Sequence, residues 1–250
     1  MKKTILAAAT LLSLCSVSAP AIAADLGGGL TANGGVSLVS DYRFRGISQT
    51  DKRFAVQGSF TLGHSSGLYG TVWGSSIADY VYYGSDQEID FTLGYKKTFG
   101  STTVDGGVLY YYYPGSGGFN SDFFEPYLSI SQAFGPVTAK VTANYAPKQA
   151  ALTTGFGKED NFYLGGDLSA TIPNTSLSVA GHIGHSFGPS YLTFGTDFTK
   201  GYTDWSVGAS YAIKNLTFGL QYVDTDGAFI TPSGRNASKA GIVGSVGVSF

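Results

Sequence analysis

Apolar and polar residues alternate along most of the chain with a period of two. Between Leu30 and Arg45, the even positions are mostly apolar or aromatic and the odd positions mostly polar. This period is that of a β-strand whose two faces lie in different environments. It predicts twelve strands, of which 68–76 has the least clear facing: residues 30–45, 54–63, 68–76, 88–98, 103–113, 122–133, 137–146, 161–172, 177–186, 204–213, 216–224 and 240–250.

The connections between these strands alternate in length. Short ones such as "HSSG" (64–67), "PNTS" (173–176) and "KN" (214–215) follow every second strand, and connections of eight or more residues follow the others. Short periplasmic turns and longer extracellular loops are typical of outer-membrane barrels. The pattern therefore predicts an all-β fold, a twelve-stranded antiparallel transmembrane β-barrel.

Aromatic residues are concentrated near the predicted strand ends, as expected for side chains at the two lipid interfaces. A soluble β-sandwich also alternates, but it needs neither two aromatic belts nor a regular change between short and long connections. The chain ends on Phe250, which is predicted to close the last strand and to act as an assembly signal. We expect the loop-side girdle to contain Tyr42, Phe44, Tyr110, Tyr112, Trp205 and Tyr222.

The first residues have the features of a secretory signal peptide. Lys2 and Lys3 precede an apolar stretch, and Ala21-Ile22-Ala23 is a small-x-small cleavage site. We therefore expect a signal peptide over 1–23 and the barrel over 24–250. Without Lys2 and Lys3, the chain has 13 basic and 17 acidic residues, and this negative net charge argues against a nucleic-acid partner.

The stretch "SDYRFRGISQTDKR" (40–53) resembles the amino-terminal signature of the TorF-type porin family, in which an aromatic-rich strand runs into Phe-Arg-Gly-x-Ser-Gln-Thr-Asp. Here that core runs from Phe44 to Asp51. The layout of signal peptide, alternating strands and terminal phenylalanine agrees with this family over the whole chain. The resemblance implies a porin-like channel in the outer membrane of Gram-negative bacteria.

Charged residues at inward positions are the candidate pore lining, because a charge on the lipid side costs several kcal/mol. They comprise seven acids and four bases, which predicts a preference for cations: Asp41, Arg43, Arg45, Glu88, Asp90, Lys96, Asp105, Glu125, Lys140, Asp167 and Asp204. Arg43 and Arg45 share one face of the first strand near the loop-side mouth. They either bind an anionic group of a solute, or are tied up by neighbouring acids or lipopolysaccharide phosphates.

The sequence favours a channel through which small polar or ionic solutes diffuse passively. The alternative is a non-conducting barrel whose loops bind a ligand or surface, and a third possibility is a lipid-modifying enzyme. Expected partners are outer-membrane lipid, lipopolysaccharide, the barrel-assembly machinery and small polar solutes.

Catalysis is the least favoured of these functions. His64, His182 and His185 are the only histidines, and none has a serine at a suitable position on the outer face of the loop-side end. The glycine-rich stretches lack the strand-to-helix context of a phosphate cradle. We therefore expect no catalytic residue, cofactor or metal.

Overall fold

The computed structural model of the 250-residue chain describes residues 23–154, 157–193 and 201–250. The predicted signal peptide lies outside these residues, apart from Ala23, and so does part of the long connection before residue 203. The described elements follow one another as β1 (Ala24–Gly27), β2 (Leu30–Val39), β3 (Arg43–Phe44), β4 (Ile47–Ser48), β5 (Ala55–His64), β6 (Leu68–Ser76), β7 (Gln87–Phe99), β8 (Thr102–Tyr112), β9 (Phe123–Phe134), β10 (Val137–Ala146), the 3₁₀ turn η1 (Ala150–Leu152), β11 (Asn161–Thr171), β12 (Leu177–Phe187), β13 (Tyr202–Ile213), β14 (Leu216–Thr225) and β15 (Gly241–Ser249).

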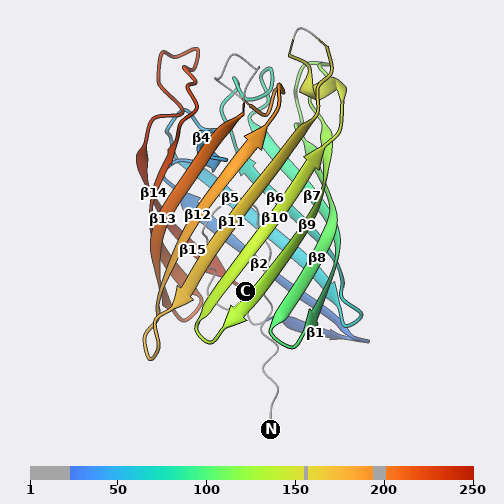
Figure 1. Ribbon diagram of the computed structural model, residues 1–250, viewed down its shortest axis with the longest axis vertical. Coiled ribbons are helices and arrows are strands. Elements are labelled where there is room, and N and C mark those ends of the chain that lie inside the picture. The colour runs from blue at the N-terminus through green and yellow to red at the C-terminus, as the bar shows by residue number, and fades with distance from the viewer. Residues whose placement is uncertain (1–22, 155–156, 194–200) are drawn as a thin grey trace.

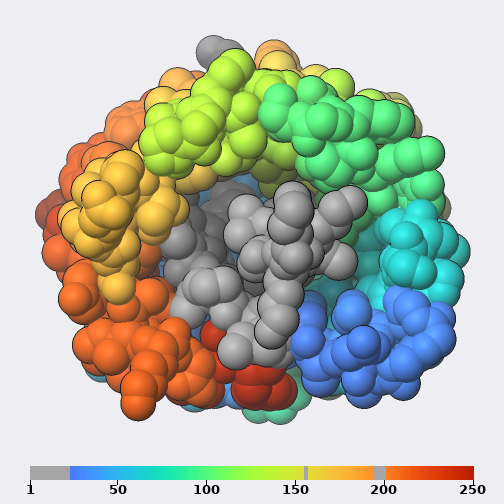
Figure 2. All heavy atoms as spheres, turned by 90° about the horizontal axis from the view of Figure 1, so that it is seen from below, coloured from blue at the N-terminus to red at the C-terminus, as the bar shows by residue number. Residues whose placement is uncertain are grey.

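The twelve long strands form one closed antiparallel barrel. From β5 onward each strand pairs with the next, and β2 pairs with both β15 and β5. Figure 1 shows the tilted strands with short turns at one end and long loops at the other. Figure 2 shows the ring from the short-turn end, with the first strands in blue beside the last in red. The prediction of a twelve-stranded barrel is confirmed.

The alternation places aliphatic side chains outside the barrel and polar ones inside it. On β5, for example, Val56, Phe60 and Leu62 are exposed on the outer face, while Gln57 on the inner face is buried. The facing of β6 follows the same rule, with Leu68 and Val72 outside and Tyr69 and Trp73 inside. In the part of the chain that the structure describes, no helix is long and apolar enough to cross a membrane.

Two further contacts complete the seam along the edge of β2 that faces β15. Beyond Ser249, the Phe250 amide donates to the Gly34 carbonyl at 2.9 Å, and the Gly34 amide donates back at 2.8 Å. Past that point β1 pairs with the first residues of β2 and so covers the edge that β15 leaves open. The sequence did not predict β1, because its residues carry no strand alternation.

The first predicted strand is shorter than expected. β2 ends at Val39, and residues 40–54, called loop 1 from here on, contain the separate two-stranded sheet of β3 and β4. This hairpin contacts the inner wall of the barrel near the end that carries the long loops. The prediction that residues 30–45 form one strand is therefore wrong at the carboxyl-terminal end of that strand.

Candidate functional site

A packed cluster of aromatic and aliphatic residues lies inside the barrel at the long-loop end. Its wall members include Leu109, Tyr111 and Phe123, and loops contribute Tyr42, Val81, Tyr82, Leu152 and Leu192, all of them buried. Tyr111 and Phe123 stack with ring centroids 4.3 Å apart, and Tyr82 lies 4.2 Å from Tyr113. The long-loop half of the barrel therefore has a core, as a soluble protein does.

The hairpin of loop 1 turns at Arg45 and Gly46. Both residues have positive φ, 46° and 82°, which is the backbone of the two-residue turns that match the twist of antiparallel strands. The turn touches the barrel wall, because a Cβ on Gly46 would lie 2.9 Å from the Asp204 Cβ and 3.0 Å from the Thr225 Cβ. Glycine is thus required twice at this position, for its φ and for the close approach.

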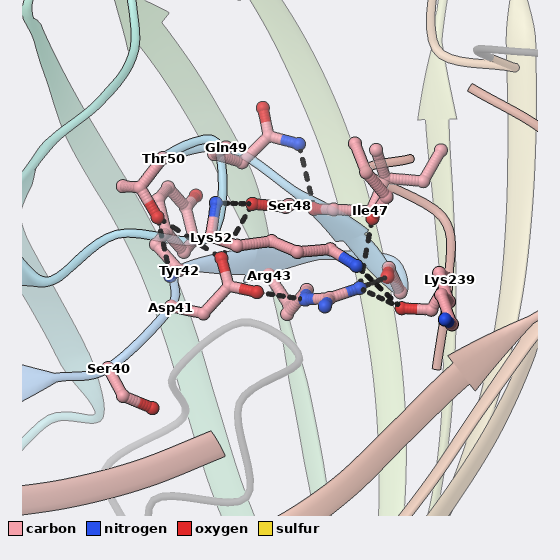
Figure 3. A network of polar contacts seen from close by, with 12 residues as sticks. Ser40, Asp41, Tyr42, Arg43, Ile47, Ser48, Gln49, Thr50, Lys52 and Lys239 are labelled. Atoms are coloured by element: carbon pink, nitrogen blue, oxygen red, sulfur yellow. Dashed lines mark hydrogen bonds and ion pairs between the residues drawn. The ribbon is translucent and has the colours of Figure 1, made fainter. Parts of the chain in front are cut away.

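Asp41 and Arg43 stabilise the base of the hairpin, as Figure 3 shows. The Arg43 Nε donates to Asp41 Oδ2 at 2.6 Å, while Ser48 Oγ and Thr50 Oγ1 donate to the other carboxylate oxygen at 2.6 and 3.1 Å. The Arg43 Nη1 donates to the carbonyls of Gly46 and Ala237, both at 2.9 Å. These bonds hold the hairpin closed and join it to residues 226–240, called loop 6 from here on.

Arg45, at the tip of the hairpin, reaches the opposite wall. Its Nη2 lies 2.7 Å from Glu125 Oε1 on β9, and its Nη1 donates to Asn161 Oδ1 at 3.1 Å. The guanidinium carbon is 4.1 Å from the ring centre of Tyr163 and 4.8 Å from that of Phe44. The side chains of this ion pair are 2% and 0% exposed, so Coulomb attraction and hydrogen bonding act here with little screening.

Neighbouring loops hold the outer side of the hairpin. The Ser48 amide donates to Ala237 O at 3.0 Å, and the Ala78 amide donates to Gln49 O at 2.7 Å. Tyr80 donates to the Ser48 carbonyl at 2.5 Å. Burial raises the pKa of Tyr80 to about 12, so its hydroxyl keeps the proton that this bond requires even in mildly alkaline solution. Loop 1 is therefore bonded on both sides.

The structure changes the assignment of two girdle residues. Tyr42 is 4% exposed, donates to Glu88 Oε1 at 3.0 Å and packs on Trp73 inside the barrel. Phe44 packs against the internal cluster and meets Tyr111 edge-on. The prediction that both belong to the outer girdle is wrong, because the chain leaves the wall after Val39 and loop 1 packs inside the barrel. Tyr110, Tyr112, Tyr222 and Phe250 are exposed, and Trp205 lies on the same outer face.

The acids predicted to face inward near the long loops are all buried. Glu88, Asp90, Glu125 and Asp204 are at most 2% exposed. Glu125 also accepts bonds from Tyr111 and Asn144. Asp90 differs from the others, because its Oδ1 is buried without a hydrogen-bond partner among the residues that the structure describes.

His182 lies between two carboxylates on the inner wall. Its Nδ1 is 2.7 Å from Asp167 Oδ1, and its Nε2 is 3.3 Å from Asp204 Oδ1. Tyr163 bonds to the same Nε2 at 2.8 Å and donates to Asp204 Oδ2 at 3.0 Å. Since Arg45 covers the ring of Tyr163, this network continues the contacts of the hairpin tip along the wall.

Toward the short turns, the inward charges lie opposite each other on neighbouring strands. Lys96 of β7 faces Asp105 of β8, and Lys140 of β10 faces Asp167 of β11. Lys96, Lys140 and Asp167 are only half-buried. Hydroxyl residues such as Thr61 and Thr71, bonded at 2.8 Å, line the same half. This half of the interior is hydrophilic, in contrast to the packed half above it.

The other histidines lie apart from these networks. His64 Nδ1 bonds to Ser66 Oγ at 2.8 Å in an exposed short turn, and His185 Nδ1 bonds to Thr203 at 3.0 Å. No group of three or more His, Cys, Asp and Glu suited to a metal ion occurs within residues 23–154, 157–193 and 201–250.

These features define a class, a closed twelve-stranded barrel of the outer-membrane type with a hairpin packed inside it. The model of the Gcw_chp family, described as "Bacterial protein of unknown function", matches residues 23–250. The chain therefore belongs to the Gcw_chp family. No curated protein matches the chain.

Solved outer-membrane proteins share the fold at low sequence identity. The NanC porin is 15% identical, with 88% of this chain and 98% of that chain covered and a TM-score of 0.59. The COG4313 outer membrane channel from Pseudomonas putida F1 is 12% identical, with 90% and 98% covered and a TM-score of 0.50. At these identities the likeness shows the fold alone.

Proposed function

We propose that the protein is a porin-like channel of the bacterial outer membrane, through which small polar or ionic solutes diffuse, and that the β3–β4 hairpin forms its constriction. The observation that carries this proposal is the closed barrel with charged and hydroxyl residues on the inner wall. A twelve-stranded barrel is wider than an eight-stranded one, in which side chains fill the interior. The fold neighbours named as a porin and a channel support the same function.

The proposal includes the location and processing of the chain. Exposed aliphatic residues around the barrel, such as Leu93, Val207 and Leu220, match a hydrocarbon-facing band. In this proposal residues 1–23 are a cleaved signal peptide, and outer-membrane lipid, lipopolysaccharide and the barrel-assembly machinery are the partners. The motif that resembles the TorF-type family is also the constriction hairpin. Among the inward charges, Arg45 and Glu125 neutralise each other, so the predicted cation preference depends on the remaining acids.

Single-channel recording in a planar bilayer tests the channel. We expect small unit conductance for the wild type and larger conductance when residues 41–52 are replaced by a short Gly-Ser turn. A large wild-type conductance that this change leaves unaltered would refute the role of the hairpin. Absence of conductance from both proteins would refute the channel itself.

One observation favours a second candidate, a non-conducting barrel whose loops bind a ligand. The internal cluster joins loop 1 to residues of three other loops, among them Val81, Leu152 and Leu192. If this packing closes the long-loop end, the barrel does not conduct. Folded protein that gives no conductance with or without loop 1 would establish this candidate over the channel. We propose no catalytic function, since none of the histidine contacts described above brings a serine to the outer face at the long-loop end; the His64–Ser66 pair lies in a short turn at the other end.

A further inference from the structure

Basic residues are concentrated in loops 1 and 6. Of the 13 basic residues after position 23, six lie in these two loops: Arg43, Arg45, Lys52, Arg53, Arg235 and Lys239. The same loops contain three acids, Asp41, Asp51 and Asp226. Arg45 is neutralised by Glu125 on the wall, so five bases remain against three acids, and the two loops keep a positive charge although the chain as a whole is acidic.

Two of the three acids of this region already accept bonds from several donors. Asp51 accepts from Thr231 at 2.9 Å, from Ser233 at 2.8 and 3.0 Å and from Arg235 Nη1 at 3.2 Å, and Arg53 lies 3.7 Å away. Asp41 is bonded to Arg43, Ser48 and Thr50 as described above. Asp226 accepts the Thr203 amide at the start of loop 6. The carboxylates of Asp41 and Asp51 are therefore well supplied with donors, while Asp226 is exposed and accepts this one bond.

Lys52 and Lys239 lie beside these pairs without a carboxylate of their own. Neither forms an ion pair with the part of the chain that the structure describes. Lys52 Nζ donates at 3.5 Å to the Lys239 carbonyl, and Arg43 Nη1 donates at 3.3 Å to the same oxygen. Figure 3 shows the side chains of Lys52 and Arg43 side by side, both pointing toward Lys239. Two cations thus share one neutral acceptor.

The position of Lys52 is fixed by the backbone. Asp51 and Lys52 both have positive φ, 53° and 57°, a region that side chains other than glycine seldom adopt, and the Lys52 amide donates to Ser48 Oγ at 2.9 Å. Partial burial and the nearby Arg43 guanidinium lower the pKa of Lys52, and Lys239 acts in the same direction, while Asp41 and Asp51 oppose this shift without cancelling it. An anion at this place would relieve that repulsion. Lys239 is exposed, so the place is open to solvent.

We propose that loops 1 and 6 form a binding site for a phosphoryl group, held by Lys52 and Lys239 with Arg235 beside them. A phosphoryl group carries up to two negative charges and presents several acceptor oxygens, which suits a set of cations better than one carboxylate does. Arg235 lies next to Lys52, because its Nη1 donates to the Asp51 carbonyl at 2.8 Å. Its side chain is 48% exposed and has further donors. The group belongs either to a phosphorylated lipid of the surrounding leaflet or to a phosphorylated solute.

Two probes on folded, purified protein distinguish these sources: inorganic phosphate, followed by the ³¹P line width, and nanodiscs that contain lipid A or dephosphorylated lipid A. The test variant is Lys52→Gln/Lys239→Gln. The control, Lys148→Gln/Lys158→Gln, removes the same charge from residues 147–160, another long connection. We expect saturable binding of a phosphate-bearing probe that is about tenfold weaker in the test variant at low ionic strength, and near wild-type in the control. Binding should also weaken as salt is raised.

The two outcomes differ clearly. Loss confined to the test variant supports the site, and the probe that binds, free phosphate or lipid A, identifies the source. Wild-type protein that binds neither probe, or equal weakening in both double variants, would overturn the proposal. Lys239→Gln alone provides a second test, because it removes an exposed ammonium and leaves the carbonyl to which loop 1 is bonded. These measurements need no conductance, so their result is independent of the proposed channel.

Discussion

Replacing Arg45 by methionine is expected to release loop 1 from the barrel wall. Methionine keeps part of the volume between Phe44 and Tyr163 but removes the charge that faces Glu125. The Glu125 side chain, with no exposed area, then keeps only the bonds from Tyr111 and Asn144. A buried carboxylate without its cation is the main cost of this change.

The expected magnitude follows from that cost. Removal of one partner of a buried ion pair destabilises by about 3–5 kcal/mol, and the lost contacts of the guanidinium with two aromatic rings add roughly 1 kcal/mol. Because these contacts join loop 1 to the wall, the change makes the free energy of docking of the loop less favourable. The ladder of twelve strands does not depend on them. The double variant Arg45→Met/Glu125→Gln removes both charges, so its loss should be clearly smaller than that of Arg45→Met.

Tryptophan fluorescence can measure this docking. The chain has two tryptophans; Trp73 packs on Tyr42 of loop 1 at 5.4 Å between ring centroids, and Trp205 lies on the outer face. In a Trp205→Phe background, Trp73 alone should report undocking, with a urea midpoint below that of the barrel. Heat-modifiable migration on a gel monitors the barrel separately.

Two results would refute the reasoning. If Arg45→Met changes the docking free energy by less than about 0.5 kcal/mol, the ion pair does not hold the loop. If the losses of Arg45→Met and Glu125→Gln simply add in the double variant, the two residues are not coupled.

Three further predictions concern single positions. Asp90→Asn should raise barrel stability by roughly 1 kcal/mol in urea unfolding, because it removes a buried charge whose Oδ1 has no partner in the described chain. If Asp90→Asn instead lowers barrel stability by as much as Glu125→Gln does, this prediction is wrong. Gly46→Ala should weaken loop docking by about 1–3 kcal/mol in the Trp73 assay, since its φ is 82° and its Cβ would lie 2.9 Å from Asp204 Cβ; alanine at Gly84, where φ is also positive but nothing lies within 4 Å, is the control for φ alone. Deletion of Phe250 should lower the yield of heat-modifiable protein in the outer membrane, because it removes both bonds to Gly34, and wild-type abundance would argue against an assembly role.

The barrel could be predicted because water inside and hydrocarbon outside impose a period of two on each strand. Residues 68–76 and 137–146 have the predicted strand boundaries, and the other predicted strands differ at their ends, mostly by one or two residues. Loop 1 could not be assigned in this way. Tyr42, Arg43, Phe44 and Arg45 continue the alternation, but the apolar members pack on an internal cluster instead of lipid. The Arg-Gly turn was the available signal for a separate hairpin, and the partners of that hairpin come from strands far apart in the sequence.

The position of the hairpin also limits what a count of inward charges can say. Arg43 and Arg45 were grouped as two bases on one face of a strand, yet Arg43 bonds to Asp41 and loop 6, and Arg45 bonds to Glu125 on the opposite wall. Each neutralises an acid from the same count. In the proposed channel, selectivity would therefore depend on the half-buried pairs near the short turns, while the hairpin would determine how wide the passage is. Undocking of loop 1 should then raise conductance more than it changes the reversal potential, since both partners of the Arg45–Glu125 pair would become hydrated together.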